Sequence, residues 1–101
     1  MWIFLNDAFL SIVADRHSDK LLVRARIPGD IERALPTAEV IQNDQADYLY
    51  RAWVDREQVA NLLSQRAQNI RYSNFKNSIK DHARHLAYLD VWEVMQTVQE
   101  G

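Results

Sequence analysis

The stretch WIFLNDAFLSIVA, residues 2–14, decides the fold class. Two apolar runs rich in β-branched and aromatic residues flank Asn6 and Asp7, a pair suited to a tight two-residue turn. This pattern is typical of an antiparallel hairpin. The sequence therefore predicts strands over residues 2–5 and 8–14, joined at Asn6-Asp7.

The strand pattern continues after a polar loop. Residues 21–27 alternate between apolar and more polar side chains, which is the period of a half-buried strand, and Pro28-Gly29 ends it. Asp30 is expected to cap a short helix through Ala34, because its carboxylate can accept hydrogen bonds from free amides of the first turn. The first half of the chain thus adds one strand and one short helix to the hairpin.

The second half moves from strands to helices. Residues 38–41 and 48–54 read as a second hairpin, and Asp55 with Gln58 has the spacing of a capping box. The helix that follows is recognised by apolar residues at helical intervals: Val59, Leu62, Leu63 and Ile70.

The last third is read as a connector and a long helix. Residues 69–77 are polar apart from two embedded aromatics, and Asp81 is expected to cap a final helix running toward Gln99. With no linker or repeat, residues 1–101 are expected to form one domain. The order of elements predicts an α+β fold, a mostly antiparallel sheet of about five short strands with two or three helices on one face. A ferredoxin-like variant is one alternative.

Composition limits the chemistry. The chain has 101 residues, of which 48% are apolar and 26% charged, values near the average for globular domains. The absence of cysteine excludes disulfides, zinc-thiolate and iron–sulfur sites and a thiol nucleophile. The only glycines, Gly29 and Gly101, cannot build a phosphate-binding loop or a dinucleotide fingerprint. No cofactor and no metal are expected.

The expected compartment is the cytoplasm. The first apolar run, residues 2–5, is too short for the core of a signal peptide and lacks a basic leader. No stretch approaches the length needed to cross a bilayer. The net charge of -2 provides no general attraction to anionic lipid or to nucleic acid.

His82 and His85 are the clearest candidate for chemistry, because a spacing of three places both imidazoles on one helix surface. As a metal site the pair needs a further ligand, and the His-Glu-x-x-His arrangement is absent. As an acid–base pair it needs a pocket. The alternative is that the two residues lie in exposed first turns or hydrogen-bond to the connector, and this structural reading is favoured.

The final helix has two apolar edges. One broad stripe is expected to meet the sheet; it contains Ala87, Val91, Val94, Met95 and Val98. Leu86, Leu89 and Trp92 form a second edge beside the histidines. This edge either packs against the preceding helix or the connector, or serves as a partner surface anchored by Trp92.

The strands offer a third candidate. Arg24 and Arg26 share one face of their strand, and Tyr48 and Tyr50 share one face of theirs. If adjacent, they would form a platform that stacks bases and pairs phosphates. The alternative is ordinary display toward water, and Arg51, between apolar neighbours, is expected to snorkel.

Several short motifs carry a resemblance. The chain opens on MWIF, contains the segment NFK at residues 74–76, and continues with the pattern HxxYxxVW at residues 85–92. These motifs resemble a widespread family of small uncharacterised bacterial proteins with no established activity. The resemblance implies a bacterial cytoplasmic setting and points to a cluster of Asn74, Lys76, His85, Tyr88 and Trp92. In the favoured interpretation, this cluster ties the connector to its helix by local hydrogen bonds.

Two functions follow from these patterns. The leading hypothesis is a non-catalytic protein-interaction or regulatory module that binds a protein partner, or a second copy of itself, through the second apolar edge of the last helix. The alternative is a small RNA-binding protein or phosphodiester-handling enzyme using Lys76, His82 and His85. An enzyme is the less favoured class because no catalytic motif is present.

Overall fold

The computed structural model describes residues 1–101, and the chain divides into two compact units where the sequence predicts one domain. Met1–Ile70 forms the first unit and Arg71–Gly101 the second. None of the helices combines the length and the apolar composition needed to cross a membrane.

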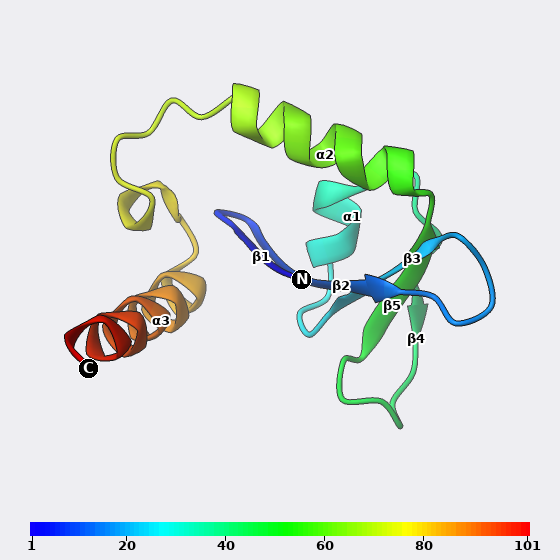
Figure 1. The fold of residues 1–101 in the computed structure, drawn as a ribbon, viewed down its shortest axis with the longest axis horizontal. Helices are drawn as coiled ribbons and strands as arrows, with labels where there is room; N and C mark the ends of the chain where they lie inside the picture. Colours follow the sequence, from blue (N-terminus) through cyan, green and yellow to red (C-terminus); the bar gives the residue numbers. More distant parts are fainter. The chain divides into compact units, whose positions relative to one another are not determined.

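The first unit is built on a five-stranded antiparallel sheet in the order β1-β2-β3-β5-β4 (Figure 1). The predicted hairpin is confirmed, because Leu5 pairs with Ala8 and leaves Asn6 and Asp7 as the turn. The strands are β1 (Trp2–Leu5), β2 (Ala8–Ala14), β3 (Leu21–Ala25), β4 (Ile41–Gln42) and β5 (Tyr50–Val54).

The second hairpin is shorter than its sequence suggests. β4 has two residues and begins at the last residue of the predicted strand 38–41. The preceding Ala38 and Val40 instead pack their side chains against the hydrophobic core. The apolar residues of this segment are there because they pack on the core, and they do not indicate a strand paired in the sheet.

Helices α1 (Asp30–Ala34) and α2 (Arg56–Gln68) lie on the same side of the sheet (Figure 1). The predicted capping box at the start of α2 is confirmed, with the Asp55 amide donating to Gln58 Oε1 at 3.4 Å. The core between the sheet and these helices includes Leu10, Ile12, Val23, Ala25, Ile31, Ala52, Val54, Val59 and Leu62.

The fold is thus α+β, as predicted. Its order of elements is three strands, a helix, two strands and then helices. This order differs from the β-α-β-β-α-β order of a ferredoxin-like domain, so the ferredoxin-like alternative does not apply.

Asp30 does not cap α1, which corrects the sequence prediction. The cap position is Gly29, whose φ of 90° is a left-handed conformation that glycine adopts without strain. The Asp30 side chain is instead fully buried, where it accepts a hydrogen bond from the Phe9 amide at 3.0 Å and pairs with Arg33. A carboxylate of the short helix therefore holds the first hairpin.

The hairpin turn is fixed from a second direction. Arg66 of α2 binds both carboxylate oxygens of Asp7, at 2.8 and 3.3 Å. Arg33 Nε also donates to the Asp7 carbonyl at 2.8 Å. Both helices on this side of the sheet thus contact the turn through arginine, a side chain whose planar fork suits two parallel hydrogen bonds to a carboxylate.

The second unit contains a short 3₁₀ helix, η1 (Lys76–Ser78), and the long helix α3 (His82–Glu100). The predicted cap of α3 is confirmed, since the Asp81 carboxylate accepts from the Arg84 amide at 2.8 Å. α3 therefore begins and ends within about a residue of its expected limits.

Candidate functional site

The connector is tied to α3 by a histidine. His85 Nδ1 lies 2.9 Å from the carbonyl oxygen of Lys76. A carbonyl can only accept, so this nitrogen carries the ring proton in the neutral tautomer. Asn74 contributes to the same segment, where its Oδ1 accepts from the Asn77 amide at 3.0 Å. These are local turn and cap contacts.

Aromatic contacts reinforce the same junction. The ring of Tyr88, which is buried, stacks on Phe75 with centroids 5.9 Å apart and an interplanar angle of 13°. Lys76 Nζ lies 5.2 Å from the centroid of the Trp92 ring, within the range of a cation–π interaction. The Lys76 side chain therefore links the connector to Trp92 of α3.

The histidines are not brought together as an acid–base pair. The His82 side chain is exposed and makes no hydrogen bond, whereas Nδ1 of His85 contacts the Lys76 carbonyl of the connector. No three histidine, aspartate or glutamate side chains of residues 1–101 are placed to hold a metal ion. The geometry around Lys76, His82 and His85 is that of a structural junction.

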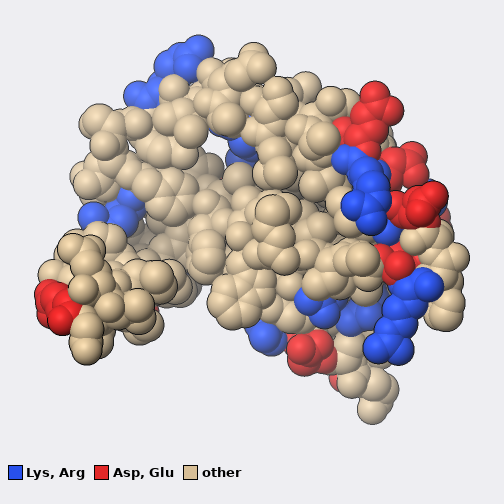
Figure 2. Space-filling model, in the orientation of Figure 1, with Lys and Arg blue, Asp and Glu red and all other residues tan.

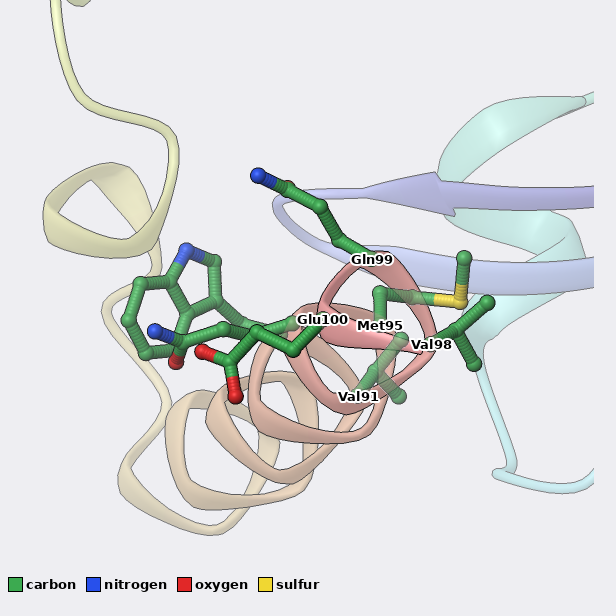
Figure 3. A pocket seen from close by; sticks show the side chains of 7 residues that line it. Val91, Met95, Val98, Gln99 and Glu100 are labelled. Atoms are coloured by element: carbon green, nitrogen blue, oxygen red, sulfur yellow. The ribbon is translucent and has the colours of Figure 1, made fainter.

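The broad stripe of α3, which the sequence predicts to meet the sheet, is not covered by the other residues of its own unit. Val94, Met95 and Val98 are 61%, 58% and 65% exposed. Figure 3, in which the helix is seen nearly end-on, shows Val91, Met95 and Val98 projecting from the same side. In Figure 2 the visible end of α3 is mostly tan. The amphipathic pattern is correct, but it does not determine what covers the apolar side.

The second predicted edge of α3 is partly exposed as well. Leu86 and Trp92 expose 48% and 50% of their surfaces, and Leu89 is half-buried. By the 100° rotation per residue of an α-helix, Glu93 lies roughly opposite the broad stripe, whereas Asp90, one turn before Val94, borders it. The apolar surface of α3 is therefore larger than the Leu86–Leu89–Trp92 edge alone. We call the whole set the α3 surface; it contains Leu86, Val91, Trp92, Val94, Met95 and Val98.

A different cluster lies on the sheet face opposite the core. One row crosses all five strands, because each neighbour is directly paired: Trp2, Ser11, Arg24, Arg51 and Ile41. The adjacent row, which includes Val23 and Ala52, is buried under the helices, so alternation places the first row on the other face. We call this surface the arginine face.

Arg24 and Arg51 stand directly opposite each other on β3 and β5. Like charges in this position are destabilising. The Nε atoms of both residues are buried and lack a hydrogen-bond partner, although Arg24 Nη2 donates to Ser11 Oγ at 2.7 Å. Neither arginine pairs with a carboxylate. The simple snorkelling predicted for Arg51 does not account for a buried, unpartnered Nε.

The predicted tyrosine platform is only half present. The guanidinium carbons of Arg24 and Arg26 lie 4.7 and 4.2 Å from the centroid of Tyr48, which is buried. Tyr50 pairs with Ala25 and packs against the core, on the other face. The alternation assumed for these tyrosines fails because β5 begins only at Tyr50, and Tyr48 lies in a bend before it.

Aromatic side chains lie at two margins of the arginine face. Trp2 contacts Phe9 edge-on with centroids 6.1 Å apart, and Phe4 lies 4.7 Å from Phe9. At the other margin, Trp53 donates its indole N–H to Asp15 at 3.1 Å. Hydrogen bonds from Ser18 and from the Trp53 indole hold the pKa of Asp15 below its usual value.

Comparisons with known proteins supply no relative: no protein-family model matches this chain, and neither do the curated proteins or the solved structures searched.

Proposed function

We propose that this protein is a non-catalytic protein-interaction module that binds a protein partner through the α3 surface. The observation that carries the proposal is the exposure of Val94, Met95 and Val98 on consecutive turns of one helix side. A contiguous exposed apolar patch of this kind is typical of an interaction site. The setting we propose is the bacterial cytoplasm that the sequence resemblance implies.

The spacing of the patch fits recognition of a helix. Ala87, Val91, Val94 and Val98 follow one another at intervals of four, three and four, which is the repeat by which a helix enters an apolar groove or pairs with another helix. Trp92 adds a large aromatic side chain of the type that anchors binding hot spots. Lys76 Nζ lies over one face of this ring, and half of the Trp92 surface stays exposed.

The contacts at the junction support a binding role over a catalytic one. The Lys76 carbonyl contacts His85, the Lys76 ammonium lies over the Trp92 ring, and the His82 side chain is exposed. The phosphodiester-handling alternative requires both histidines to face one pocket, whereas His82 is exposed and His85 Nδ1 is engaged with the connector. The junction instead fixes the first half of α3 and leaves its second half exposed.

A charge placed on the stripe tests this function. Val94→Asp is expected to weaken partner binding by about 3 kcal/mol, or roughly 100-fold in Kd, because a carboxylate would be buried in an apolar interface. Thr97→Asp is the matched control, since it adds the same charge beside Glu93 on the polar side. Because both sites are exposed, unfolding free energies of the two variants should differ by at most ~0.5 kcal/mol from the wild type.

Two measurements complete this test. Sedimentation velocity over a range of concentrations reports pairing with a second copy, and capture from bacterial lysate followed by titration of the purified partner reports another protein. The proposal predicts that the complex seen by either route persists with Thr97→Asp and is lost with Val94→Asp. A complex that both variants form equally well would place the interaction elsewhere, and a chain that stays monomeric and captures nothing would contradict the proposed function.

A further inference from the structure

The arginine face holds two positive charges that repel each other without a compensating negative charge. Arg24 and Arg51 are cross-strand neighbours, so their Cβ atoms are expected to lie about 5 Å apart. Neither is matched by a carboxylate. Side chains arranged in this way destabilise the sheet by themselves, and an anion bound between them would remove the repulsion.

Part of the hydrogen-bonding capacity of the pair is also unused, although Arg24 Nη2 donates to Ser11 Oγ. The Nε atoms of Arg24 and Arg51 are buried without a partner, whereas buried polar atoms in folded proteins nearly always have one. Guanidinium groups present donors in a planar fork that matches phosphate. Two independent observations, the opposed charges and the orphaned donors, thus point to the same missing ligand.

Exposed tryptophans at the margins of the arginine face favour an anion that also carries aromatic rings. Trp2 is 66% exposed at one edge strand, and Trp53 is 42% exposed two residues beyond Arg51 on β5. Aromatic rings beside a basic strip are the means by which proteins bind single-stranded nucleic acid, with bases on the rings and phosphates on the arginines. Tyr48 is not available for stacking, because Arg24 and Arg26 already lie against its ring.

We propose that the arginine face binds a short single-stranded nucleic acid, with Arg24 and Arg51 holding phosphate and Trp2 and Trp53 stacking bases. The net charge of -2 argues only against broad, non-specific attraction. Figure 2 shows basic and acidic side chains interspersed over the visible surface of the sheet-bearing unit. The proposed attraction therefore depends on Arg24 and Arg51, and not on a broad basic surface. The inference is independent of the α3 surface.

Substitution of Arg51 tests this proposal. We expect Arg51→Gln to weaken binding of a fluorescent 12-nucleotide oligo(U) by at least tenfold at 50 mM salt, measured by fluorescence anisotropy. The dependence of log K on log salt should become shallower by about 0.7, the value for one lost phosphate contact on a single strand. The matched control is Arg56→Gln, which removes one positive charge from α2 on the other side of the sheet.

A stability measurement distinguishes a binding role from a structural one. Since Arg51→Gln removes the repulsion with Arg24, its melting temperature should equal or exceed that of the wild type while binding is lost. Trp53→Ala should independently weaken oligo(U) binding roughly tenfold with little change in the salt dependence, because stacking is lost and not charge.

Three results would overturn the inference. The first is the absence of oligo(U) binding by the wild type at low salt. The second is equal loss of binding in Arg51→Gln and Arg56→Gln, which would mean non-specific attraction. The third is an affinity for polyphosphate, an anion without bases, equal to that for oligo(U), which would mean that base stacking does not contribute to binding.

Discussion

Asp30→Ala is expected to lower the free energy of unfolding of the sheet-bearing unit by about 3 kcal/mol. The Asp30 carboxylate is fully buried and accepts the Phe9 amide from β2 while pairing with Arg33. Removing it leaves the partly buried Phe9 amide without this acceptor and Arg33 without its counter-ion. Urea unfolding followed by circular dichroism measures the loss.

Two variants serve as controls for the role of Asp30. Glu32→Ala removes an exposed carboxylate from the same short helix and should change stability by at most ~0.5 kcal/mol. Asp30→Asn keeps the shape of the side chain and one acceptor oxygen, so its free energy of unfolding should lie between those of Asp30→Ala and the wild type. Similar losses for Asp30→Ala and Glu32→Ala would contradict the assigned contacts.

Leu10→Ala is expected to lower the free energy of unfolding by about 3 kcal/mol, measured in the same urea assay. Leu10 lies in β2 with no exposed surface and belongs to the core between the sheet and its two helices. Truncation removes buried apolar surface and leaves a cavity that the neighbouring strands cannot fill.

Val13→Ala is the matched control for this core substitution, because Val13 lies on the same strand but on the opposite, arginine face. Val13→Ala should lower the free energy of unfolding by no more than about 1 kcal/mol, which is the span of strand propensities measured in a host protein. A reversal of the two effects would mean that the core lies on the other side of the sheet.

Local patterns predicted the elements whose determinants are close in sequence. Asn6-Asp7 specified the first hairpin, and the Asp55–Gln58 box and Asp81 marked the starts of α2 and α3. In each case the interacting groups lie within a few residues of one another. The role of Asp30 was not predictable in this way, because its partner, the Phe9 amide, lies 21 residues away.

The candidate sites depend on long-range register and on neighbours that the sequence does not name. Arg24 and Arg51 stand opposite each other only because β3 pairs with β5, whereas β4, the next strand in the sequence, lies at the edge beyond β5. Periodicity identified the apolar stripe of α3, but it could not tell a side chain that packs within the chain from one such as Val94 that stays exposed. An apolar stripe indicates that a partner surface exists, and the partner has to be found by other means.

Oxidation of Met95 tests the central claim most directly. The chain has two methionines, and Met1 and Met95 are 61% and 58% exposed. In dilute wild-type protein treated with hydrogen peroxide, peptide mass spectrometry is expected to show both thioethers oxidising at similar rates, with Met95 alone becoming protected when the partner complex forms. Protection of Met95 in the dilute monomer would show that the α3 surface is covered within the chain, and would contradict its assignment as a binding surface.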